Sequence, residues 1–165
     1  MIKIEKDLHL LHHSKCKNIK GEFMKIAVAN DHAGTELKNF LIKKLKKDGF
    51  KVTDFGTNSE QAVDYPDYAQ IVAKEVQKKK FEFGILICGS GIGMSIAANK
   101  IEGIRAALVY DLYTAEHAKK HNNANIITFG SRNLKNEDAY IFIKKYLKTD
   151  FELRHNNRLK KIEKI

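Results

Sequence analysis

The sequence predicts one α/β domain with three layers (α/β/α), in which a five-stranded parallel sheet lies between two layers of helices. Two observations support this fold class. Five short apolar segments alternate with longer segments whose apolar residues recur at helical spacing, which is the pattern of parallel strands joined by helices. The chain also has 165 residues, enough for a hydrophobic core without disulfides or a structural metal.

The first elements are two strands and the helix between them. Residues 24–30 are mostly apolar and predict the first strand. A helix is predicted over 34–48, where apolar residues form one stripe, and Gly49 ends it as a glycine after a helix often does. Residues 50–54 predict a short second strand.

The middle of the chain adds the second helix and the central strand. The helix is predicted over 65–79, with the only proline of the chain, Pro66, in its first turn, where proline is tolerated. Residues 84–88 are apolar or small throughout, as in a strand buried on both faces. A glycine-rich loop then leads into a helix over 94–100.

The remaining elements complete the sheet. We expect a strand over 104–110, a helix over 114–121, a strand over 125–129 and a long last helix that Asn136 caps. Five parallel strands with helices on both faces form a Rossmann-like sheet.

Residues 1–23 do not continue this pattern. They mix His, Lys and Leu without a clear period, so we expect a poorly ordered amino-terminal extension, with Met24 as the natural start of the domain. The domain is then 24–165 and ends in a basic tail. Polar residues interrupt any apolar centre of a signal peptide, and two cysteines form no disulfide framework, so we expect a cytoplasmic protein.

A metal site and a membrane anchor are not expected. His12, His13 and Cys16 are possible ligands, but no fourth ligand lies near them in the sequence. No apolar run approaches the roughly 20 residues of a membrane span.

The net charge of +10 raises the possibility of a nucleic-acid partner. The lysines, however, gather in pairs and triplets on predicted helix faces and ends, without interleaved aromatic residues. We therefore expect no nucleic acid, and keep a basic nucleic-acid-binding module as an alternative, which would bind with a steep salt dependence.

The loop after the central strand carries the strongest functional signal. Gly89, Gly91 and Gly93 alternate between a strand and a helix, where backbone N–H groups can cradle an anion. Cys88 stands at the mouth of this loop, and such surroundings favour a thiolate. A dinucleotide site is the rival interpretation, but its third glycine would have to occupy the position of Met94.

Ligands of such sheets bind at the carboxyl ends of the strands. The residues that follow predicted strands at this edge are Asp31, His32, Cys88 to Gly93, Tyr110, Asp111 and Gly130 to Arg132. His121 and Asn122 precede a strand and therefore lie at the opposite edge. A long loop or a second subunit would have to bring His121 to the ligand.

Six motifs together resemble the type B ribose-5-phosphate isomerase family, which includes allose-6-phosphate and galactose-6-phosphate isomerases. In family order they are Asp31-His32-Ala33-Gly34, Asp64-Tyr65-Pro66-Asp67, the run from Cys88 to Lys100, Gly103-Ile104-Arg105-Ala106, His121-Asn122-Asn123-Ala124-Asn125 and Phe129-Gly130-Ser131-Arg132. The match runs from Met24 to about Arg158.

The resemblance implies a metal-free and cofactor-free aldose–ketose isomerase that interconverts ribose 5-phosphate and ribulose 5-phosphate through a cis-enediolate. Cys88 would move the proton between carbons 2 and 1, and His121, helped by Asp31, would open the furanose ring. The implied substrate-binding residues are Asp31, His32, Tyr65, Gly89, Ser90, Gly91, Ile92, Gly93, Asn122, Arg132, Arg154 and Arg158. One branch of the family has a glutamate where Met94 stands, so the thiol version is expected here.

The resemblance also implies a homodimer or a dimer of dimers; Arg154 and Arg158 would bind the substrate phosphate, and the tail that carries them can reach across the dimer interface. Two alternatives stay open: the same chemistry on a hexose 6-phosphate such as allose or galactose 6-phosphate, and a sugar-phosphate-binding protein without turnover.

Overall fold

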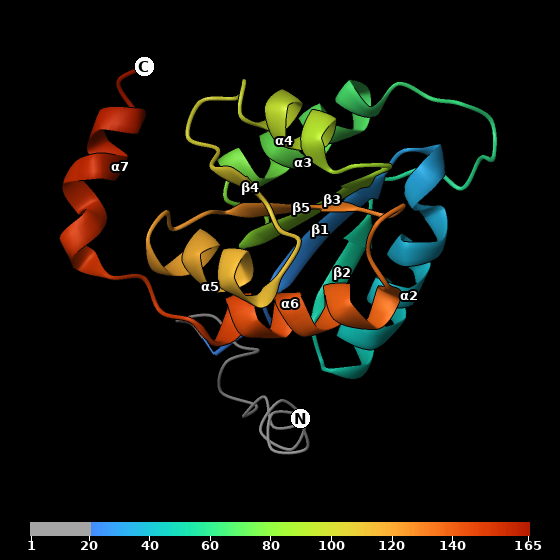
Figure 1. Ribbon diagram of the computed structural model, residues 1–165, viewed down its shortest axis with the longest axis horizontal. Coiled ribbons are helices and arrows are strands. Elements are labelled where there is room, and N and C mark those ends of the chain that lie inside the picture. Colours follow the sequence, from blue (N-terminus) through green and yellow to red (C-terminus); the bar gives the residue numbers. More distant parts are fainter. Residues whose placement is uncertain (1–20) are drawn as a thin grey trace.

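The computed structural model describes residues 21–165 (Figure 1). The possible metal ligands His12, His13 and Cys16, and most of the expected extension over 1–23, lie outside the described residues.

The centre of the described domain is a five-stranded parallel sheet, as the sequence predicts. Its strands are β1 (Lys25–Asn30), β2 (Lys51–Asp54), β3 (Phe83–Cys88), β4 (Ala106–Leu108) and β5 (Ile126–Gly130). They lie in the order β2-β1-β3-β5-β4, and each neighbouring pair is parallel. The sequence pattern does not reveal this order, because it depends on which connection crosses which strand.

Helices cover both faces of the sheet, so the three-layer prediction is confirmed (Figure 1). One face carries α3 (Tyr65–Gln77) and α4 (Ile92–Ala98), and the other carries α2 (Thr35–Lys47), α5 (Leu112–Lys120) and α6 (Asn136–Lys148). The chain ends in α7 (Asn156–Ile162); the short 3-10 helices are η2 (His32–Gly34) and η3 (Leu153–His155).

The central strand β3 has every residue buried, because helices pack on both of its faces. Ile85 and Ile87 point into the core under α2, α5 and α6, whereas Leu86 and Cys88 belong to the core under α3 and α4. The alternation of a strand therefore directs the Cys88 side chain toward the face that carries α4.

Several details differ from the sequence expectations, and the start of α5 at Leu112 rather than near residue 114 is one of them. The helix after the glycine loop begins at Ile92, two residues early, because Gly91 already turns the chain with φ of 77°. Strand β4 covers only Ala106–Leu108 of the expected 104–110. The prediction that Asn136 caps α6 is wrong: Lys135 occupies the cap position, and the Asn136 amide instead donates to Glu36 on α2 at 3.0 Å.

No helix within residues 21–165 is both long enough and apolar enough to span a membrane.

Candidate active site

The glycine loop wraps around the Cys88 sulfur. The backbone N–H of Gly91 donates to Cys88 Sγ over 3.1 Å, and the side chain of Cys88 is buried. The N–H of Ile92 is held by the Ser90 hydroxyl at 3.3 Å. Cys88 is the free cysteine of the described residues. The sulfur therefore accepts a backbone N–H next to the start of α4.

Two glycines of this loop lie in close contact with other site residues. A Cβ on Gly93 would come within 2.6 Å of the Tyr65 ring, and one on Gly89 would come within 3.1 Å of the Arg132 guanidinium. Tyr65 and Arg132 therefore pack directly on the loop backbone. Tyr65 is 38% exposed, so its ring borders both the loop and solvent.

The loops after β1 and β5 are attached to the same place. Asp31 donates its N–H to Ile87 O at 3.0 Å, next to Cys88, and its carboxylate caps η2 by accepting from Ala33 at 2.9 Å. Nδ1 of His32 accepts from the N–H of Val63 at 3.3 Å, which ties η2 to the segment before Tyr65.

Two more residues hold this loop: Ser131, which the sequence analysis placed at the ligand edge without a role, and Thr128, which it missed. The Ser131 hydroxyl lies 2.8 Å from Ala33 O and 3.2 Å from Cys88 O, so it joins three loops. Thr128, fully buried in β5, donates to Gly91 O at 2.9 Å. The one available signal for Thr128 was a hydroxyl within an otherwise apolar strand.

We call Asp31, His32, Tyr65, Arg132 and the loop Cys88 to Gly93 the cysteine half-site. These ten predicted site residues lie together at the carboxyl edge of the sheet, as the topology rule predicts.

The other four predicted site residues lie elsewhere. His121 and Asn122 follow α5 on its return to the amino end of β5, and Arg105, just before β4, donates to Asn122 O at 3.1 Å. Strand β5 has five residues, which separates the two edges by roughly 16 Å at about 3.3 Å per residue. One copy of the chain therefore does not unite His121 with Cys88.

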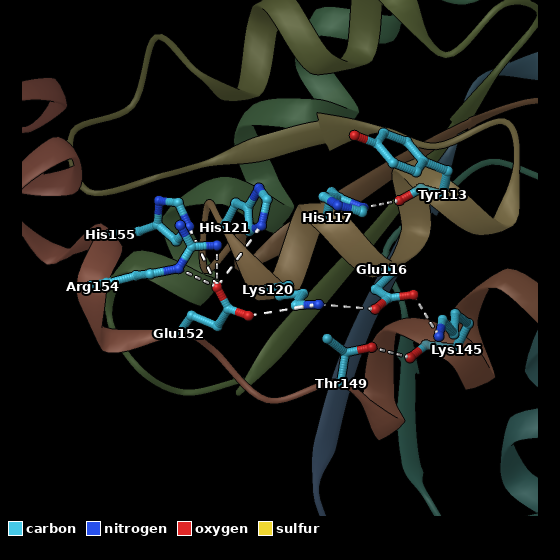
Figure 2. Close-up of polar contacts among 10 residues, drawn as sticks. All are labelled: Tyr113, Glu116, His117, Lys120, His121, Lys145, Thr149, Glu152, Arg154 and His155. Carbon is cyan, nitrogen blue, oxygen red and sulfur yellow. Dashed lines mark hydrogen bonds and ion pairs between the residues drawn. The ribbon is translucent and has the colours of Figure 1, made fainter.

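The tail after α6 runs back to His121 (Figure 2). The His155 ring lies 4.3 Å from the His121 ring, and Nη1 of Arg158 is 2.9 Å from Nδ1 of His155. Arg154 donates through Nε to Oε2 of Glu152 at 2.6 Å. We call His121, Asn122, Arg154 and Arg158 the histidine half-site; Glu152 and His155, which the sequence analysis did not select, complete its surroundings.

Electrostatics in this half-site favour neutral imidazoles. Burial lowers the pKa of His121, and the neighbouring His155, His117 and Arg154 lower it further, while Glu152 acts in the opposite direction. Burial, Arg154 and Arg158 lower the pKa of His155, again against Glu152. The Arg154 hydrogen bond holds the pKa of Glu152 below its usual range, so Glu152 is a carboxylate.

His121, Glu152 and His155 are also the group of described residues whose possible metal-ligand atoms lie within 4.8 Å of one another. Their chemistry fits a cation poorly. Arginine can only donate, so Nδ1 of His155 accepts from Arg158 and the ring proton sits on Nε2, the atom that faces Glu152. Arg154 already occupies Oε2 of Glu152.

The chain is similar to known proteins over most of its length. The model of the family described as Ribose/Galactose Isomerase matches residues 26–162. A ribose-5-P isomerase B of Listeria innocua is 47% identical over 128 residues, which cover 78% of this chain and 86% of that protein.

Solved structures agree. A ribose 5-phosphate isomerase of Thermotoga maritima superimposes with a TM-score of 0.84 at 45% identity, covering 86% of this chain and 99% of that one. A ribose-5-phosphate isomerase B of Mycoplasma genitalium with bound ribulose-5-phosphate gives 0.82 at 40% identity, covering 86% and 95%. With motifs, fold and relatives in agreement, the chain belongs to the ribose/galactose isomerase family.

Proposed function

We propose that this protein is an aldose–ketose isomerase that interconverts ribose 5-phosphate and ribulose 5-phosphate through a cis-enediolate. The observation that carries the proposal is the Cys88 sulfur held by the Gly91 N–H inside a glycine loop. The names of the relatives support the pentose phosphate as substrate.

Cys88 acts as the base in this proposal. The thiolate takes the proton from carbon 2 of the open-chain aldose and returns it to carbon 1, while a proton moves from the hydroxyl on carbon 2 to the oxygen on carbon 1. A proton next to a carbonyl is weakly acidic, so the negative charge that develops on oxygen needs fixed donors. The N–H groups of the loop, with the Ser90 hydroxyl, are suited to that task.

His121 supplies the proton that opens the furanose ring, and Arg154 and Arg158 bind the phosphate. Because His121 lies at the opposite edge from Cys88, we propose that the working site combines the cysteine half-site of one copy with the histidine half-site of another. Asp31, His32, Tyr65, Arg132 and Asn122 contact the sugar in this arrangement.

Exposed apolar side chains support a homodimer or a dimer of dimers. Ile92 and Ile96 on α4 are 53% and 59% exposed, and Tyr110 and Tyr113, around the start of α5, are 64% and 68% exposed. Large exposed apolar groups next to a ligand site are typical of a surface that a partner covers. A free thiol at the site also suits a reducing compartment, so we propose a cytoplasmic enzyme.

The experiment is turnover of ribose 5-phosphate by the full chain without added metal, with Cys88→Ala and with allose 6-phosphate in parallel. We expect the wild type to turn over ribose 5-phosphate and Cys88→Ala to be inactive. Activity on the hexose alone would keep the chemistry and overturn the substrate. A folded wild-type protein inactive on both sugars would contradict the proposal.

A further inference from the structure

Glu152 stands at the centre of the histidine half-site, although its position in a basic tail gave no sign of this (Figure 2). Its Oε2 lies 2.6 Å from Arg154 Nη2, 3.6 Å from His155 Nε2 and 4.0 Å from His121 Nε2. Its Oε1 lies 3.6 Å from Lys120 Nζ. One carboxylate thus faces two cations and two imidazoles.

The backbone fixes this carboxylate in place. The N–H of Glu152 donates to Lys120 O at 2.9 Å, and the N–H of His155 donates back to Glu152 O at 3.0 Å. The segment before η3 is therefore fastened to the end of α5, where His121 is the helix cap. The two histidines reach the carboxylate from separate elements.

Each imidazole turns its Nε2 toward Glu152. The proton of neutral His155 sits on Nε2, because Arg158 occupies Nδ1 as a donor. His155 is 3% exposed, and its Nε2 makes no hydrogen bond with the described residues; Oε2 of Glu152 lies 3.6 Å from it. For His121, an anion beside Nε2 favours a proton on that nitrogen and leaves Nδ1 as the nitrogen that can exchange its proton.

We propose that Glu152 is a positioning residue that holds the Nε2–H edge of His121, so that the protonated imidazole gives the proton that opens the furanose ring from Nδ1. This inference rests on the proposed function. In the step, the bond between carbon 1 and the ring oxygen breaks, and the ring oxygen takes the Nδ1 proton. The hydroxyl on carbon 1 gives its proton to a carboxylate or water, which leaves the aldehyde, and solvent reprotonates His121.

Glu152 also opposes the groups that lower the pKa of His121. The charged and titratable groups that face His121 are His117 on its own helix and Glu152, Arg154 and His155 from the tail, and Glu152 is the one that raises the pKa of His121. Without the carboxylate, burial and the other three groups all favour the neutral imidazole.

Two measurements distinguish a role of Glu152 in ring opening from a purely structural role: turnover of ribose 5-phosphate, and hydrogen exchange of ribulose 5-phosphate with solvent. Turnover of ribose 5-phosphate needs ring opening, whereas ribulose 5-phosphate has its 5-hydroxyl phosphorylated and cannot close a furanose ring. Exchange of its carbon 1 hydrogen in deuterated water therefore needs the Cys88 base but no ring-opening acid. Both reactions use the same phosphate contacts.

The experiment measures both reactions for the wild type, Glu152→Gln, His121→Ala and Glu116→Gln. Glu116 is the matched control, because it also pairs with Lys120, at 3.5 Å, but binds Lys145 rather than a histidine. We expect Glu152→Gln to lose at least about tenfold in kcat on ribose 5-phosphate, part of the roughly 10²–10⁴ that a general acid contributes.

Exchange into ribulose 5-phosphate should stay within about twofold of the wild type in Glu152→Gln and in His121→Ala. The high-pH limb of kcat/KM should move to lower pH in Glu152→Gln, and Glu116→Gln should match the wild type throughout. An equal loss of turnover and exchange, or no loss of either, would overturn the role of Glu152. A wild type without turnover or exchange would instead overturn the proposed function.

Discussion

The backbone N–H of Gly91 donates to the sulfur of Cys88, three residues earlier in the chain, over 3.1 Å. Gly91 has φ of 77°, and a Cβ there would lie 2.6 Å from Leu108 and 2.8 Å from the carbonyl carbon of Phe129. A glycine is therefore needed both for the turn and for the space. The sulfur is held by a backbone group that no side-chain motion can withdraw.

Replacing the sulfur tests this arrangement directly. Cys88→Ser keeps the size of the side chain but puts a hydroxyl, a far weaker acid than a thiol, in place of the base, so turnover should fall by at least about 10²-fold. Solvent exchange at carbon 1 of ribulose 5-phosphate should fall with it. Circular dichroism should stay unchanged, and a Cys88→Ser protein with wild-type turnover would exclude the thiolate as the base.

The contact between Gly93 and Tyr65 predicts that substitutions at these two residues have non-additive effects on substrate binding. Gly93→Ala places a methyl group within 2.6 Å of the Tyr65 ring, which is partly exposed and can swing aside. We expect a modest loss of stability. KM should also rise, because the displaced Tyr65 ring no longer contacts the sugar.

A double-mutant cycle with Tyr65→Ala checks this. Tyr65→Ala alone should weaken substrate binding, and Gly93→Ala should add little to it, since the clash has been removed. Additive effects of the two substitutions would show that the ring does not carry the effect of Gly93→Ala.

How far the sequence predicts this site depends on the range of the interactions. Strands, helices and the ligand edge follow from local periodicity, and the position of His121 before a strand correctly predicts that it lies at the opposite edge. The roles of Thr128 and Ser131 could not be predicted, because each hydrogen-bonds a carbonyl more than 35 residues away. Strand order is set by the same long-range packing.

The hydrogen bond from Thr128 to Gly91 O predicts an effect on stability and activity together. Thr128→Val keeps the shape of the side chain but removes one of the two donors to Gly91 O, which keeps the Ser95 N–H at 3.1 Å, so the expected cost is about 0.5–1.5 kcal/mol. Urea unfolding at fixed protein concentration measures this loss, and turnover should fall because the loop around Cys88 loses one of its attachments.

Thr149→Val is the matched control. Thr149 also donates to a carbonyl, that of Lys145 at 2.8 Å, but at the end of α6. We expect a smaller loss of stability, since this site is partly exposed, and unchanged turnover. If Thr149→Val lowers turnover as much as Thr128→Val does, the effect belongs to general stability and not to the loop.

The buried imidazole of His155 predicts a loss of stability in acid. Burial, Arg154 and Arg158 lower its pKa below the ordinary value of 6.5 in the folded protein. Around that value the unfolded chain therefore binds more protons than the folded one, so the free energy of unfolding falls as the pH drops through and below 6.5. At pH 7.5 both states are largely deprotonated, and the effect is absent.

Urea unfolding at pH 7.5 and 5.5 checks this prediction, with protein concentration held constant because association adds to apparent stability. The wild type should lose stability between the two pH values, and His155→Gln, which cannot titrate, should lose less. His117→Gln is the control, since His117 is only half-buried on α5 and stacks on Tyr113 at 3.8 Å. An acid loss in His155→Gln as large as in the wild type would mean that other groups, and not the buried imidazole of the tail, set the sensitivity to pH.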